Sequence, residues 1–127
     1  MRHLTDVESF SAHSNQITDI AGLEQLPNLK EVVISHNQIS DLSALQHLPK
    51  LRYMEISFNN ITDISPLTKL IALEHLDLSD NEISDIEGLE KLTKLRFLNV
   101  ENNKIKKLGH RTFFSKIPAF YFKRKSF

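Results

Sequence analysis

The stretch LKEVVISHNQISDLSALQHL, residues 29–48, decides the architecture because the rest of the chain repeats it. Counted from Asn37, aliphatic residues lie eight, five and three positions before it and two, five, eight and eleven positions after it. The pattern recurs every 22 residues, and its asparagines are Asn15, Asn37, Asn59, Asn81 and Asn103. A fixed period of about 20–50 residues indicates a solenoid, in which each turn buries its apolar side against its neighbours.

The two halves of the repeat favour different structures. Apolar residues five and three positions before the asparagine show the two-residue alternation of a strand. Those after it are spaced by about three, which suits a 3₁₀ or irregular helical return. The asparagine amide carries both donors and an acceptor, so stacked copies can pair with turn backbone that would otherwise be buried without partners. We therefore predict an α/β leucine-rich repeat solenoid that is curved, with a parallel sheet on its concave face and short 3₁₀ or helical returns on its convex face.

One domain is expected over residues 1–127, with about five 22-residue repeats over residues 4–108 and a degenerate closing segment over residues 109–127. Six strands are predicted, starting near Glu8, Glu31, Tyr53, His75, Phe97 and Ala119. In the closing segment Phe114, Ile117, Phe120 and Phe122 keep apolar positions of the repeat, whereas Lys125 replaces the asparagine. No polar cap precedes Leu4, so we expect a piece or a shortened relative of a longer array. It would be a monomer or a weak dimer formed through the open sheet edge near Phe10.

Composition narrows the remaining possibilities. The chain has no cysteine, which excludes disulfides and thiolate zinc sites. It has no run of 18 apolar residues, and residues 1–10 lack the apolar centre of a signal peptide. We therefore expect a cytoplasmic protein from the sequence as it stands. A secreted or cell-surface location stays open if a signal peptide has been lost.

Charge is distributed unevenly although the net charge is zero. Residues 1–103 contain all 16 acidic residues and 8 basic ones, a net of 8 − 16 = −8. Residues 104–127 contain the other 8 basic residues and no acid, a net of +8. The body of the solenoid is therefore acidic and its last segment basic.

An Asp follows Ser or Thr shortly after four of the asparagines, at Asp19, Asp41, Asp63 and Asp85. A side-chain oxygen at this place can accept an unpaired backbone N–H where a helical turn begins. Calcium-binding repeats also use carboxylates, but they are rich in glycine and this chain has three. We predict turn capping for this column.

The repeat LxxLxxLxLxxNxIxDIxxLxxL, with variants such as ITDISPL at residues 61–67, resembles the bacterial internalin-type leucine-rich repeats. It is also similar to the 22-residue repeats of a eukaryotic phosphatase-regulating subunit. The resemblance covers roughly residues 4–108 and is most specific for the fold. It implies a non-catalytic module that binds a protein partner on its concave face. The alternative that it implies is a regulatory or scaffold subunit of a phosphatase-like enzyme.

Strand geometry places the residues six, four and two positions before each asparagine on the concave face, in columns about 4.8 Å apart. Tyr53 and Phe97 are aromatic residues that the core does not need, and Phe58 lies at the rim. Aromatic side chains beside carboxylates are typical of recognition surfaces. The predicted protein-binding residues are Glu31, Val33, Tyr53, Glu55, Phe58, His75, Asp77, Phe97 and Asn99. The partner is expected to present a basic patch.

Other activities are less well supported. Glu55, Asp77 and His75 would be neighbours, so a carboxylate pair with a base or a metal site is conceivable. The face is shallow and the residues have no metal-ligand spacing, so no catalytic residue, metal or cofactor is predicted. The basic run Lys123-Arg124-Lys125 is short, and the acidic body would repel phosphate, so contact with nucleic acid or an anionic membrane through this tail is the least supported alternative.

Overall fold

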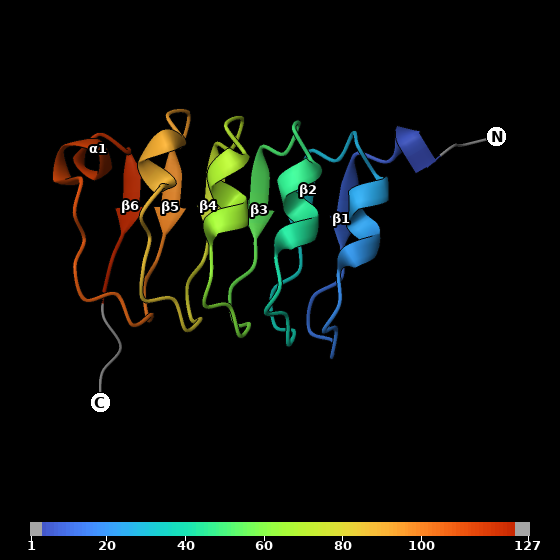
Figure 1. Ribbon diagram of the computed structural model, residues 1–127, viewed down its shortest axis with the longest axis horizontal. Coiled ribbons are helices and arrows are strands. Elements are labelled where there is room, and N and C mark those ends of the chain that lie inside the picture. The colour runs from blue at the N-terminus through green and yellow to red at the C-terminus, as the bar shows by residue number, and fades with distance from the viewer. Residues whose placement is uncertain (1–3, 124–127) are drawn as a thin grey trace.

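The computed structural model describes residues 4–123 and consists of a single row of stacked turns (Figure 1). Six short parallel strands form one open sheet in the order β1-β2-β3-β4-β5-β6. The strands are β1 Ser9–Ser11, β2 Glu31–Val33, β3 Tyr53–Glu55, β4 His75–Asp77, β5 Phe97–Asn99 and β6 Ala119–Tyr121. The helical segments are η1 Leu4–Asp6, η2 Ala21–Gln25, η3 Ser43–His47, η4 Ser65–Lys69, η5 Leu89–Lys91 and α1 Arg111–Ser115. Figure 1 shows η2 to η5 as a second layer in front of the strands.

The strand register reproduces the sequence period. Glu31 pairs with Tyr53, Tyr53 with His75, and His75 with Phe97, so each strand is displaced from the next by one repeat. The predicted solenoid and its parallel sheet are confirmed. β1 begins at Ser9, next to the predicted start near Glu8, whose carbonyl accepts bonds from the N–H groups of Lys30 and Glu31.

The core lies between the two layers and is built from the periodic aliphatic positions. Met54 on β3, Ile56 directly after it, and Ile61, Ile64 and Leu67 on the return are all at most 2% exposed. Burying such a side chain contributes about 1.5–3 kcal/mol. A three-residue strand and one helical turn cannot enclose these side chains alone, so the stability of each repeat depends on the repeats on either side of it.

The asparagine ladder joins neighbouring turns. Asn59 is 7% exposed, and its Nδ2 donates to the carbonyls of Ile34, Ile56 and Ser57 at 3.1–3.2 Å. Its Oδ1 accepts the N–H of Ile39 at 3.0 Å. Asn37, Asn81 and Asn103 make the corresponding four bonds. Asn15 differs, because it is exposed and bonds within its own turn, to the carbonyl of His13 at 3.0 Å.

The residue before each asparagine adopts a left-handed backbone conformation, which the sequence did not reveal. These residues are Ser14, His36, Phe58, Asp80 and Asn102, with φ between 54° and 59°. Asp and Asn tolerate this region, whereas a bulky residue such as Phe58 is strained there. The strain is held by the hydrogen bonds of the turn, since the N–H of Phe58 donates to the carbonyl of Ser79 in the next repeat at 3.1 Å.

The Asp column caps the turns that lead into the helical returns, in agreement with the predicted turn capping. Asp41 and Asp63 accept the N–H two residues later, at Ser43 and Ser65, each at 2.9 Å. Hydrogen bonds from these two serines hold the pKa of each carboxyl below its usual value. Asp19 and Asp85 make the same bond.

The closing segment keeps the repeat's packing but changes its return. Phe114 and Ile117 are 2% and 7% exposed, and β6 forms the predicted sixth strand. The return is the α-helix α1 instead of a 3₁₀ turn, and Arg111, which takes a leucine position of the repeat, lies exposed at its start. Lys125, which takes the asparagine position, lies outside the described residues. Among residues 4–123, no helix combines the length and the apolar character that crossing a membrane requires.

Candidate functional site on the concave face

A ladder of stacked rings runs across the concave face from β3 to β5. The ring of His75 lies between those of Tyr53 and Phe97, with centroids 4.1 Å apart on both sides and interplanar angles of 13° and 4°. Tyr121 on β6 extends the ladder, with its ring 5.5 Å from that of Phe97 and tilted by 47°. Because neighbouring parallel strands present equivalent residues side by side, the 22-residue period itself brings the rings of Tyr53, His75 and Phe97 together.

The stack partly buries its own members. Tyr53, His75 and Phe97 are half-buried, not fully exposed, because each covers the face of the next ring. Stacked aromatic pairs contribute about 0.5–1.5 kcal/mol beyond their buried area. The ladder is therefore an aromatic strip that contacts within the protein already form in the absence of a partner.

Glu55 ties the ladder to the neighbouring column of residues. The hydroxyl of Tyr53 donates to Oε1 of Glu55, and this bond, with smaller contributions from burial and nearby carboxylates, raises the pKa of Tyr53 to about 12. Nε2 of His75 lies 3.7 Å from the same oxygen. Burial lowers the pKa of His75, and the charges of Glu55 and Asp77 only partly oppose that effect. The lowered pKa favours the neutral imidazole, so the approach of His75 to Glu55 does not depend on a charged histidine.

The remaining predicted residues extend the surface around the ladder. Asp77 accepts bonds from the N–H and hydroxyl of Ser79, and Asn99 accepts the N–H of Glu101, so both side chains are held in place. Val33 is half-buried on β2, and Glu31 beside it is exposed.

Phe58 lies apart from the ladder, in the turn that follows β3. Its ring stacks on His36 with centroids 4.4 Å apart and remains 48% exposed.

Tyr121 is 46% exposed and was not among the predicted site residues. The sequence could have indicated Tyr121 as a site residue, because in the predicted sixth strand it takes the exposed position that Asn99 takes in the fifth.

A charged row along the edge of the face was also missed. Glu8, Lys30, Arg52, Glu74 and Arg96 precede the strands at one position of the repeat and, with the residues that follow them, line an open depression of about 650 Å³. Lys30 pairs with Glu8 at 2.9 Å, and Arg52 approaches Glu74 at 3.9 Å. The 22-residue period could have revealed this row, because its residues lie one position before the first exposed column in each repeat.

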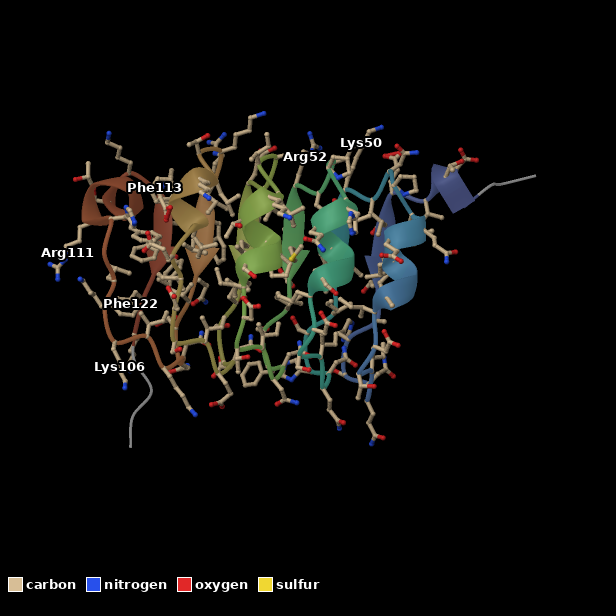
Figure 2. The ribbon with its side chains drawn as sticks, in the orientation of Figure 1. Lys50, Arg52, Lys106, Arg111, Phe113 and Phe122 are labelled. Carbon is tan, nitrogen blue, oxygen red and sulfur yellow. The ribbon has the colours of Figure 1, made fainter. Side chains whose placement is uncertain are left out.

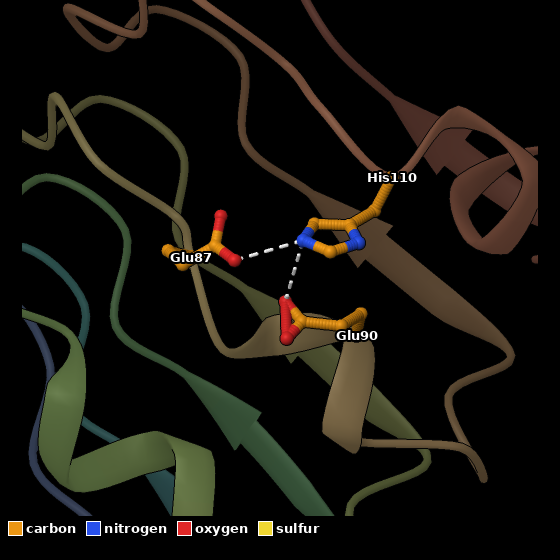
Figure 3. Close-up of side chains that lie close together, drawn as sticks. All are labelled: Glu87, Glu90 and His110. Atoms are coloured by element: carbon orange, nitrogen blue, oxygen red, sulfur yellow. Dashed lines mark hydrogen bonds and ion pairs between the residues drawn. The ribbon is translucent and has the colours of Figure 1, made fainter.

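Three potential metal ligands meet elsewhere, where the return of the fourth repeat lies beside the loop before α1 (Figure 3). Nε2 of His110 lies 2.8 Å from Oε1 of Glu87 and 3.6 Å from Oε1 of Glu90. The hydrogen bond to Glu87 raises the pKa of His110. Glu90 also accepts the N–H of Gly88 at 2.7 Å. Each group thus has a partner within the protein, and the cluster fastens the loop before α1 to the preceding return.

Comparison with protein families settles the classification. The family model for leucine-rich repeats in two copies matches residues 5–47, 49–81 and 71–115, which together span most of the chain. The chain belongs to the leucine-rich repeat family. No match among curated proteins was found.

Solved structures of leucine-rich repeat proteins superpose on nearly the whole chain. The internalin InlF from Listeria monocytogenes is 36% identical, with a TM-score of 0.89 over 93% of this chain and 35% of its own. Internalin C2 from the same organism is 30% identical, with a TM-score of 0.80 over 96% of this chain and 53% of its own. A leucine-rich repeat protein from Leptospira interrogans is 25% identical, with a TM-score of 0.80 over 94% of this chain and 31% of its own. The fold is therefore internalin-like, and the chain spans between about a third and about half the length of these relatives.

Proposed function

We propose that this leucine-rich repeat protein is a non-catalytic module that binds a protein partner on its concave face. The observation that carries the proposal is the stacked ladder of Tyr53, His75 and Phe97 beside the carboxylates of Glu55 and Asp77. Leucine-rich repeat proteins are commonly protein-interaction modules, and this face offers an apolar strip with fixed polar neighbours. Pre-organised aromatic anchors reduce the entropy lost on binding.

The charges of the face define the partner's chemistry. The exposed strand columns and the turn after them carry five acids, namely Glu31, Glu55, Asp77, Asp80 and Glu101, and no Lys or Arg up to Asn102. A partner with a basic patch around an apolar centre would satisfy both the carboxylates and the ladder. Its association rate should fall as salt is raised, because screening shortens the range of the attraction.

The position of Phe58 also supports a binding site on the concave face. A phenylalanine at φ 54° that is 48% exposed contributes little to the core and is strained. Strained residues that the surrounding structure holds in place occur disproportionately at binding sites. We place Phe58 at the rim of the interface, where it contacts the partner together with His36.

Comparative capture would test this function. The wild-type chain, the Tyr53→Ala/Phe97→Ala double variant and a Lys69→Ala control would each be immobilised and exposed to the same extract with a crosslinker. We expect one set of basic proteins to be retained by the wild type and the control and lost by the double variant. Circular dichroism and urea unfolding would establish that the double variant is folded.

The opposite pattern would refute the assignment. Proteins held equally by the wild type and the folded double variant, but lost by Lys69→Ala, would place the site on the helical side. A phosphatase among the captured proteins would favour the alternative role as a regulatory subunit.

A further inference from the structure

Cations gather along the edge of the array where the helical returns lead into the strands. Three turns there join η3 to β3, η4 to β4 and η5 to β5, and we call residues 47–52, 69–74 and 91–96 the basic edge. Figure 2 shows Lys50 and Arg52 on this edge. The basic edge contains one acid, Glu74, and six exposed cations, a net of 6 − 1 = +5, the cations being Lys50, Arg52, Lys69, Lys91, Lys94 and Arg96.

The backbone holds these three turns side by side. The N–H of Glu74 donates to the carbonyl of Arg52 at 2.9 Å, and the N–H of Arg96 donates to the carbonyl of Glu74 at 2.8 Å. Neighbouring strands of a sheet lie about 4.8 Å apart, so equivalent residues of successive repeats form a row. The cations of the basic edge therefore act together on whatever approaches it.

Contacts within the protein neutralise little of this charge. Arg52 approaches Glu74 at 3.9 Å. Nζ of Lys50 and Nζ of Lys69 donate to amide oxygens of neighbouring side chains, at 2.6 Å and 3.2 Å. These amides are neutral, so both lysine charges remain uncompensated. Within residues 4–123, no ion pair is formed by the other three cations of the basic edge, Lys91, Lys94 and Arg96.

The opposite edge carries the opposite charge over the first four repeats. There each asparagine turn, from two residues before the asparagine to five after it, contains no Lys or Arg. These four turns hold six acids, namely Asp19, Asp41, Asp63, Asp80, Glu82 and Asp85. The sign reverses only in the fifth turn, where Figure 2 shows Lys106 far from Lys50 and Arg52. An anionic surface would therefore attract the array by its basic edge and turn the acidic edge away.

An exposed aliphatic side chain lies in the middle of the basic edge. Ile71 is 65% exposed in the central turn, and the equivalent residues of the turns on either side are Pro49 and Thr93. Cations around an exposed apolar side chain favour a bilayer interface, because the cations meet anionic headgroups while the apolar group reaches the acyl boundary. The apolar stems of lysine side chains can lie along the same interface.

We propose that the basic edge docks on a membrane surface that contains anionic lipids, with Ile71 entering the headgroup region. A protein partner would find none of the usual aromatic anchors, because the basic edge contains no Phe, Tyr or Trp. Single-stranded nucleic acid binds where bases stack on free aromatic rings. The rings beside this edge, those of Tyr53, His75 and Phe97, instead cover one another's faces.

Sedimentation with vesicles would test this docking. Vesicles of phosphatidylcholine, alone or mixed with phosphatidylserine, would be incubated with the wild type at low and at high salt. We expect the wild type to sediment with the mixed vesicles only, and to be released as salt is added, because salt screens the attraction of the headgroups. Absence of binding to the mixed vesicles at low salt, or equal binding to both kinds of vesicle, would overturn the proposal.

Matched charge reversals locate the contact. Lys50→Glu/Lys94→Glu alters the basic edge, and Lys106→Glu/Lys107→Glu makes the same charge change in the fifth asparagine turn, on the opposite edge. The first variant should weaken binding to the mixed vesicles about tenfold or more, and the second should stay within about threefold of the wild type. Loss of binding in the second variant alone would refute the assignment to the basic edge. Urea unfolding would show that both variants are folded.

A fluorescent reporter tests the orientation. The chain has no Trp, so Ile71→Trp and Phe58→Trp each introduce a single one, on the basic edge and at the rim of the concave face. The mixed vesicles should shift the emission of the Ile71→Trp variant to the blue and leave that of the Phe58→Trp variant unchanged. The reverse result would contradict edge-on docking.

Two further comparisons separate this docking from other kinds of binding. Because edge-on docking leaves the concave face open, the Tyr53→Ala/Phe97→Ala variant should bind the mixed vesicles like the wild type, whatever partner that face has. A DNA duplex or polyglutamate, added at the same concentration of negative charge as the vesicles, should leave the wild type bound to them. Displacement by either polymer would show that the basic edge recognises polyanions in general, and would overturn the membrane assignment.

Discussion

Replacing Asn59 by alanine should destabilise the array by about 1–3 kcal/mol, chiefly through one buried N–H group. The three carbonyls that lose its Nδ2 each keep another donor, since Asn37 bonds to Ile34, Asn81 to Ile56, and the N–H of His36 to Ser57. The N–H of Ile39, by contrast, has the Oδ1 of Asn59 as its partner. An unpaired buried donor costs about 1–3 kcal/mol, and the loss of second bonds to the carbonyls adds less.

Urea unfolding followed by circular dichroism would measure this cost, with Asn15→Ala as the matched control. Asn15 occupies the same position of the first repeat but is exposed and bonds only within its own turn among the described residues. Its replacement should change the free energy of unfolding by less than about 0.5 kcal/mol. Equal effects at the two positions, or a loss below about 0.5 kcal/mol at Asn59, would refute the role given to the ladder.

Further predictions concern glycines, capping and pH. Gly88→Ala should lower the melting temperature, because φ of Gly88 is +102° and the new Cβ would lie 2.5 Å from Cγ2 of Thr68. Gly22→Ala is the matched control: its Cβ would meet nothing within 4 Å, so the melting temperature should stay the same or rise. Asp63→Ala should lower stability at neutral pH, and the difference from wild type should vanish as pH falls through the lowered pKa of Asp63, below 3.8. The pKa of His110 in the folded protein is raised above 6.5, so the stability that protonated His110 contributes is complete below pH 6.5 and is lost as pH rises through the raised pKa. Urea unfolding over a pH series should show this loss in the wild type and not in His110→Gln. A loss that persists in His110→Gln would contradict the assignment.

The fold could be predicted from the sequence because one periodic signal determines most of it. Before each asparagine, buried apolar residues such as Met54 and Ile56 alternate with more exposed ones, and this alternation specifies both the strand and the face that it buries. The spacing of 22 residues then specifies a parallel register. The left-handed turn residues could not be predicted, because a bulky residue such as Phe58 does not favour that conformation and adopts it only within the bonded turn.

The candidate site could be predicted in position but not in detail. The period placed Tyr53, His75 and Phe97 in one row, and that row is present. Their stacking, which half-buries the rings, depends on side-chain orientation that periodicity does not encode. Tyr121 was overlooked because the sixth repeat lacks the asparagine from which the exposed columns were counted. Arg96 was overlooked because the first predicted column begins one residue after it, at Phe97.

Calorimetric titration of a captured partner against wild type and two single variants tests the central claim most directly. Phe97→Ala truncates the ladder, and Ile71→Ala truncates an apolar side chain that is 65% exposed in the loop before β4. We predict that Phe97→Ala weakens binding by about 2 kcal/mol or more, while Ile71→Ala changes it by less than about 0.5 kcal/mol. Wild-type affinity in a folded Phe97→Ala variant, with binding lost in Ile71→Ala, would show that the ladder is not the binding site.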